Sequence, residues 1–218
     1  MRRNNVSATA PGTRKHVHFD ELAALILSRP PRLGPVRLVA IDGPSGAGKT
    51  VFAERLAERL NAPVVHTDDL LDGWGDQFTF WARLEDKVLQ PLRHGRIAEY
   101  RRYRWDPPGF GGEAVRIEPA GVIVMEGVSS ARRVIRPELS LTVFVSAPSD
   151  LRLRRALARD GGDSVAFRAY LERWRAREEE HFAAEGTARF ADVQVNGAGE
   201  TMGEDDERYE RTNREMDR

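Results

Sequence analysis

A glycine-rich segment carries the residue types that bind phosphate. It reads Gly43, Pro44, Ser45, Gly46, Ala47, Gly48, Lys49 and Thr50, which matches G-x-x-x-x-G-K-[ST] at every fixed position. In such a loop, backbone N–H groups point at phosphate oxygens, and glycines keep side chains out of the way. Lys49 would add a positive charge at the β- and γ-phosphates, and the Thr50 hydroxyl would ligate Mg²⁺. The segment therefore predicts phosphate binding and leaves the reaction open.

Three acids follow short apolar runs, where the end of a parallel strand would place them beside this loop. Asp68 and Asp69 follow Val64–His66, and Glu126 follows residues 122–125. Asp68 could accept the proton of an attacking hydroxyl or hold Mg²⁺ through water, and Asp69 is a candidate acceptor ligand. Glu126 occupies a Walker-B-type position, suited to outer-sphere metal binding or to acceptor hydroxyls. The alternatives are a helix cap for the two aspartates and a solvated strand end for Glu126.

Arginines repeat along a predicted helix at 149–159. Arg152, Arg155 and Arg159 are spaced i, i+3 and i+7, so one helix face would carry all three. From there they could close over the phosphates and neutralise charge during transfer, a role that we assign to Arg155 and Arg159. A solvated helix face is the alternative, because nearly all basic residues of this chain are arginine.

Aromatic side chains between the second and third strands suggest a small-molecule pocket. Trp81, Tyr103 and Trp105 could stack on a planar or sugar face, with Arg102 and Asp106 as polar handles. Packing in the core explains each aromatic residue equally well.

Continuous apolar runs predict the strands that position these residues, and helical patterns alternate with them. The predicted strands cover 36–41, 64–66, 122–125, 141–145 and 193–195, and the predicted helices cover 19–27, 50–60, 79–93, 149–159 and 164–184. We expect an α/β P-loop NTPase fold, with a parallel β-sheet of about five strands flanked by helices and a helical lid.

Length and composition fit one domain with extensions. The chain has 218 residues, which we divide into an N-terminal extension with a short helix (1–35), a P-loop kinase domain (36–197) and a charged, disordered tail (198–218). Its 34 acids balance 34 bases, which argues against nucleic-acid binding. The absence of cysteine excludes disulfides and thiolate metal sites. No uncharged apolar run approaches the roughly 18 residues of a membrane span, so we expect a soluble cytoplasmic protein with no membrane partner.

Five landmarks occur in an order that resembles a known family. They are V-A-I-D-G-P-S-G-A-G-K-T, H-T-D-D-L, V-I-V-M-E-G-V, D-L-R-L-R-R-A-L-A-R-D and F-A-D-V-Q-V-N-G. Over roughly residues 36–197 the chain resembles the uridine kinase-like family of P-loop kinases, which includes uridine kinase, phosphoribulokinase, pantothenate kinase and nicotinamide riboside kinase relatives. The resemblance implies transfer of the γ-phosphoryl of Mg-ATP to a small-molecule hydroxyl. It also implies Asp68 as base, Glu126 near metal or acceptor, arginines near Arg159 in a lid, and the stretch from Asp192 to Gly197 near the adenine.

The acceptor region departs from the uridine kinase pattern. The histidine that reads the base there has no counterpart in Tyr100–Gly109, and Arg159-Asp160 runs into Gly161-Gly162-Asp163 instead of an Arg-Gly-Arg sequence. Our leading hypothesis is a kinase that uses ATP and Mg²⁺ on a nucleoside or nucleoside-like acceptor. Its alternatives are a kinase of a sugar, vitamin precursor or antibiotic intermediate, and a nucleotide-dependent regulatory ATPase. Homo-oligomerisation is left open.

Overall fold

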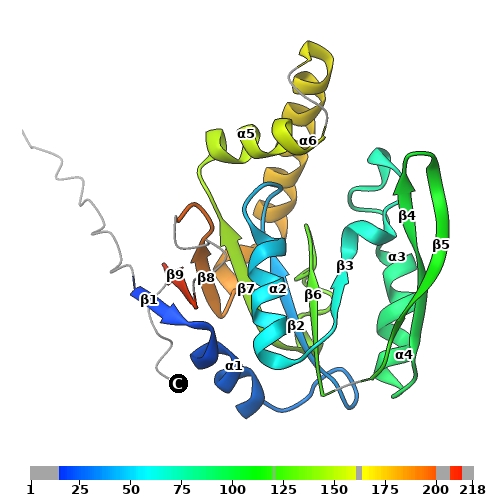
Figure 1. Cartoon of the computed structure of the whole chain (residues 1–218), viewed down its shortest axis with the longest axis vertical. Coiled ribbons are helices and arrows are strands. Elements are labelled where there is room, and N and C mark those ends of the chain that lie inside the picture. Colours follow the sequence, from blue (N-terminus) through cyan, green and yellow to red (C-terminus); the bar gives the residue numbers. More distant parts are fainter. Residues whose placement is uncertain (1–14, 120, 161–163, 200–206, 213–218) are drawn as a thin grey trace, which may run out of the picture.

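The computed structural model describes residues 15–119, 121–160, 164–199 and 207–212 (Figure 1). A seven-stranded sheet has the order β1-β9-β8-β7-β2-β6-β3. The strands are β1 (Lys15–His18), β9 (Arg208–Arg211), β8 (Val193–Asn196), β7 (Leu139–Ser146), β2 (Arg37–Asp42), β6 (Val122–Glu126) and β3 (Val64–His66). The run from β8 to β3 is parallel throughout and corresponds to the predicted strands, which confirms the α/β fold.

Helices cover both faces of the sheet. They are α1 (Phe19–Ser28), α2 (Lys49–Leu60), α3 (Trp81–Leu84), α4 (Gln90–Arg93), α5 (Ser149–Asp160), α6 (Val165–Glu185) and α7 (Thr187–Phe190), and a π-helical turn, η3 (Glu85–Leu89), joins α3 to α4. Helix α5 and the upper part of α6 lie beyond the end of β7, where the sequence predicts a lid (Figure 1). None of the helices in the described part of the chain has the length and apolar character needed to cross a membrane.

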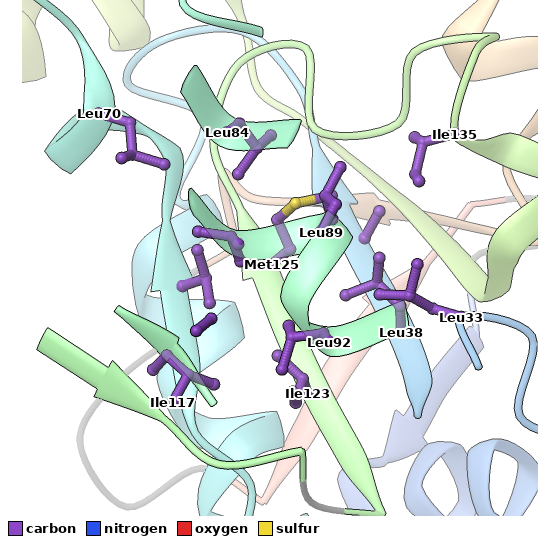
Figure 2. Packing of buried hydrophobic residues seen from close by; sticks show 14 of the residues in the cluster. Leu33, Leu38, Leu70, Leu84, Leu89, Leu92, Ile117, Ile123, Met125 and Ile135 are labelled. Atoms are coloured by element: carbon purple, nitrogen blue, oxygen red, sulfur yellow. The ribbon is translucent and has the colours of Figure 1, made fainter. Parts of the chain in front are cut away.

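Successive side chains of strand β2 belong to two different core clusters, one on each face of the sheet. Leu38 and Ala40 join the cluster under η3 and α4, whereas Val39 and Ile41 join the cluster under α1 and α2. Successive side chains of a strand point to opposite faces, so both faces of the central strands must be apolar. Figure 2 shows the first cluster, in which Leu89 and Leu92 pack near Met125 and Ile123 of β6.

A two-stranded antiparallel hairpin, not predicted from the sequence, stands beside the main sheet. It consists of β4 (Ala98–Trp105) and β5 (Pro108–Ile117), and β4 packs against the short 3₁₀ helix η1 (Thr67–Leu70). Its base is buried through Ala98, Tyr100 and Ile117. Arginine and glycine occupy many other positions, so the apolar alternation that marks a strand is weak.

The C-terminal segment corrects the prediction of a disordered tail for residues 207–212. Strand β9 pairs with both β1 and β8, and Tyr209 is 2% exposed. Its ring lies 5.3 Å from the rings of Phe19 and Phe52, centroid to centroid. The N-terminal extension thus contributes a strand and a helix that pack on the domain, and residues 1–14, 200–206 and 213–218 of the two predicted extensions lie outside the described residues.

Replacing Tyr209 with alanine removes the aromatic anchor of this edge. We expect Tyr209→Ala to lower the free energy of unfolding by about 3 to 5 kcal/mol, because it leaves a cavity between Phe19 and Phe52. Phe190, which is 59% exposed, supplies the control: Phe190→Ala should cost less than about 1 kcal/mol. Chemical denaturation measures both values. Equal losses would show that β9 does not anchor the edge.

Candidate active site

The phosphate-binding loop connects β2 to α2 and is shaped by close contacts. Gly46 has φ +76°, and a Cβ there would lie 2.6 Å from the carbonyl oxygen of Arg152 on α5. A larger residue would therefore be strained and would push α5 away. Lys49 begins α2 with its side chain folded under the loop, where Nζ donates to the Pro44 carbonyl at 3.1 Å. The loop is compact and its lysine is in place.

A buried aspartate fixes the start of the loop. Asp42 is fully buried at the end of β2, and its carboxylate accepts hydrogen bonds from the N–H groups of Gly43 (2.7 Å), Ser129 (2.8 Å) and Ala131 (2.9 Å). Burial raises the pKa of the Asp42 carboxyl to about 6, although these bonds and the charge of Lys49 act in the opposite direction. Asp42 therefore ties the phosphate loop to the segment that follows β6.

The Glu126 carboxylate contacts a hydroxyl group and an imidazole ring. Thr50 Oγ1 donates to Glu126 Oε1 at 3.3 Å, and His66 Nδ1 lies 2.7 Å from the same oxygen. The pairing of β3 with β6 sets His66 beside Glu126, and their hydrogen bond raises the pKa of the histidine. In the described residues no three His, Asp or Glu side chains form a metal cluster. This set fits Mg²⁺, which takes few protein carboxylates and completes its shell with waters and phosphates.

Asp68 faces the same space from the end of β3. Although Asp68 is exposed at the cleft, the protein atoms around its carboxyl desolvate it and raise its pKa; the negative charge of Glu126 adds to the shift, whereas Lys49 and Arg159 oppose it. A carboxylate with a raised pKa is a better proton acceptor.

Two cavities meet at Asp68. The first, of about 420 Å³, is lined by the phosphate loop, Lys49, Thr50, Glu126 and Arg155. The second, of about 560 Å³, is lined mainly by apolar and aromatic side chains. Ser45, Asp68 and Arg159 line both cavities and so mark the boundary between them.

The second cavity is bounded by tryptophans from three separate segments. Trp74 comes from the short 3₁₀ helix η2 (Trp74–Asp76), Trp105 from the end of β4 and Trp174 from α6. The ring of Trp74 lies 4.5 Å from that of Trp105 and 5.7 Å from that of Trp174, centroid to centroid. Tyr103 stacks edge-on against Trp105 at 5.1 Å. The hairpin and α6 thus contribute to the same wall of the second cavity.

The other predicted acceptor residues lie in different places. Trp81 packs against the core, where the Arg132 guanidinium lies 5.0 Å above its ring, so its environment is that of a core residue. Arg102 forms an ion pair with Asp69 at 3.1 Å, which joins the hairpin to the segment after β3. Asp106 is exposed at the turn of the hairpin. Neither cavity is lined by Trp81, Asp69, Arg102 or Asp106, so the predicted contacts of these residues with the acceptor remain predictions.

Three arginines of α5 make different contacts. Arg155 donates to the carbonyls of Gly46 (3.1 Å) and Gly197 (3.0 Å), so it holds the phosphate loop to the end of β8. Arg159 reaches the boundary between the cavities. Arg152 is buried and donates to the Ala147 carbonyl at 3.1 Å. Asp192, at the opposite end of β8 from Gly197, binds Thr142 and Arg29 instead of facing the nucleotide cavity.

No family model matches the chain. It is 30% identical over 136 residues to inorganic pyrophosphatase TTM2 of Arabidopsis thaliana, an alignment that takes in 56% of the chain and 20% of that protein. It is 28% identical over 143 residues to a uridine kinase of Staphylococcus haemolyticus, covering 56% of the chain and 68% of the relative. The chain thus spans about a fifth of the plant protein and about two thirds of the bacterial kinase.

A solved structure shows the same fold. A possible uridine kinase from Bacillus stearothermophilus superimposes with a TM-score of 0.58 and 20% identity, covering 81% of this chain and 96% of that one. In sequence and in fold the chain is thus similar to uridine kinases. As in the sequence prediction, this uridine kinase-like chain brings the phosphate loop, Asp68, Glu126, Arg155 and Arg159 around one cavity.

Sequence reasoning missed four residues of this site. His66 and Asp42 carry a signal, since each is a polar residue at the end of an apolar strand. Trp74 carries none, because its segment has no periodicity. Glu178, discussed below, stands first in a run of three glutamates that is typical of a solvated helix face.

Asp42 makes stability depend on pH in a direction opposite to that of a salt-bridged carboxylate. Its folded pKa of about 6 exceeds the ordinary value of 3.8, so the folded state binds more protons between those values and stability falls as pH rises through them. The free energy of unfolding of the wild type minus that of Asp42→Asn should decrease by about 2 kcal/mol from pH 4 to pH 7. Urea denaturation across that range measures it. A difference that is constant with pH would contradict the buried charge.

Proposed function

We propose that this protein is an ATP-dependent kinase that transfers the γ-phosphoryl group to a hydroxyl of a small molecule, with a nucleoside or nucleoside-like compound as the first acceptor class. The observation that supports this most is the meeting of two cavities at Ser45, Asp68 and Arg159. One is built from phosphate-binding groups and the other from aromatic surface. A donor and an acceptor bound side by side would place the transferred group at that boundary.

The donor cavity supplies groups that match a triphosphate. The loop N–H groups and Lys49 would bind the phosphates, and Thr50 and Glu126 would hold Mg²⁺, with Asp68 acting through water. Mg²⁺, when bound, neutralises negative charge on the phosphates. Arg155 keeps the loop in place through the Gly46 carbonyl, and Arg159 adds positive charge at the boundary.

We assign the role of base to Asp68. The acceptor oxygen would form a bond to the γ-phosphorus as the bond from phosphorus to the β,γ-bridging oxygen breaks, which releases ADP. The hydroxyl proton would pass to the Asp68 carboxylate. The raised pKa of Asp68 favours this transfer. The charge of Lys49 opposes that shift and so favours the ionised form of the carboxyl.

The acceptor cavity favours a compound with a flat ring. Trp74, Trp105 and Trp174 offer stacking faces, and Leu71 and Leu171 add apolar surface. The polar side chains of this cavity that could meet a substrate, Ser45, Asp68 and Arg159, lie at the boundary with the donor. A nucleoside fits this distribution, with its sugar hydroxyl at Asp68 and its base among the tryptophans. A ring-bearing vitamin precursor or antibiotic intermediate fits it as well.

The decisive experiment measures ADP release from Mg-ATP across nucleosides, cytidine monophosphate, ring-bearing vitamins and free sugars, with mass spectrometry of each product. We expect release that depends on an acceptor with a ring, a product heavier by one phosphate, and loss of both with EDTA. Equal release in every well, including the well without acceptor, would instead favour a regulatory ATPase. Phosphorylation of free sugars alone would contradict the assignment of the aromatic cavity.

Asp68→Asn isolates the proposed base. An amide cannot take the hydroxyl proton, so we expect kcat to fall by about 100-fold or more while the dissociation constant for Mg-ATP changes little. Asp72→Asn, an exposed substitution four residues along the chain, is the matched control and should retain full activity. Full phosphoryl transfer by Asp68→Asn with ATP binding intact would exclude Asp68 as the base.

A further inference from the structure

The lid helix α6 carries a carboxylate that is bound directly to the phosphate loop. Glu178 is fully buried, whereas Glu179 and Glu180 beside it are exposed. Its Oε1 and Oε2 accept from the Ser45 N–H at 3.1 and 3.2 Å, and Oε1 also accepts from the Ser45 hydroxyl. The indole N–H of Trp174, one helical turn earlier, donates to Oε1 at 2.9 Å.

These hydrogen bonds have a role beyond packing α6 against the domain. A buried carboxylate is stable only where donors replace its lost hydration, and here the donors come from the phosphate loop and α6. Arg152 of α5 adds a guanidinium whose Nη1 lies 3.9 Å from Glu178 Oε2. One carboxylate therefore connects the loop with both helices of the lid.

The position of Ser45 gives the contact a functional meaning. Ser45 lines both the donor and the acceptor cavity, and Trp174 lines the acceptor cavity. The Trp174 indole N–H also lies 3.2 Å from the Ser45 hydroxyl. A ring bound against Trp174 would thus press on a residue that shares hydrogen bonds with the phosphate loop.

We propose that Glu178 is a positioning residue that holds Ser45, and with it the phosphate loop, in the shape that receives nucleotide, and that Trp174 links this contact to the acceptor cavity. The inference rests on the proposed function only in taking the loop as the nucleotide site. Because the carboxylate already occupies the Ser45 N–H, Glu178 acts on the loop and not on the phosphates. Without it, the loop would lose its third residue as a fixed point and nucleotide binding would include the entropic cost of ordering it.

Calorimetric titration with Mg-ADP, and with the ATP analogue that has an imido group between the β- and γ-phosphorus, tests this without knowledge of the acceptor. We expect Glu178→Ala to weaken binding of both about tenfold or more, because removal of the carboxylate frees Ser45. Glu178→Gln should lie between this variant and the wild type, since its amide oxygen still accepts from Ser45. The control Glu179→Gln changes an exposed neighbour on the same helix and should leave the dissociation constants unchanged.

Trp174→Phe provides a second readout that a purely structural role would not produce. It removes the indole donor but keeps an aromatic ring, so it should weaken nucleotide binding by a few fold in the wild type and have little further effect in Glu178→Ala, where the acceptor of that hydrogen bond is gone. Thermal denaturation, run in parallel, confirms that each variant is folded, and Glu178→Gln carries the test if Glu178→Ala does not fold.

Equal dissociation constants for the wild type and a folded Glu178→Gln, with only the melting temperature lowered, would overturn the positioning role. Tighter binding in the variants would also overturn it, because the carboxylate would then act as a repulsive charge. A wild-type chain that binds neither nucleotide would contradict the proposed function and this inference together.

Discussion

The site depends on one buried carboxylate that joins the ends of two neighbouring strands. Asp42 lies at the end of β2 and binds N–H groups on both its own loop and the segment after β6. The phosphate loop follows the first strand and Glu126 ends the second, so this contact sets the distance between phosphate-binding and metal-binding groups. A neutral residue of similar size would satisfy fewer of those N–H groups. The energetic penalty of a buried charge at this position is therefore linked to the geometry of the site.

The acceptor side is organised by a different kind of interaction. Three tryptophans from η2, β4 and α6 meet there, and none of these segments belongs to the main sheet. Strands hold the donor groups to fixed positions, whereas the acceptor wall is assembled from elements outside that sheet.

Much of the donor side could be predicted from the sequence, because each signal there is local. The loop has a fixed spacing, and Asp68 and Glu126 each follow an apolar run that forms a buried strand. The hairpin, β9 and the burial of Glu178 could not be predicted, since they depend on contacts between distant segments. Tyr209 is buried because Phe19 and Phe52 lie beside it, and Trp81, partly buried, packs against the core although its type and position also suit a pocket. A residue type alone does not distinguish these environments.

The way in which the loop is held also explains how it remains attractive to anions. Lys49 binds the Pro44 carbonyl and Arg155 binds the Gly46 carbonyl, so cations stabilise the loop through its oxygens. Each of these contacts adds positive charge beside the cavity. Two carboxylates bind N–H groups of the loop, Asp42 at Gly43 and Glu178 at Ser45, and Arg152 lies next to the second. The loop is thus held from several sides, by cations on its carbonyl oxygens and by carboxylates on its N–H groups.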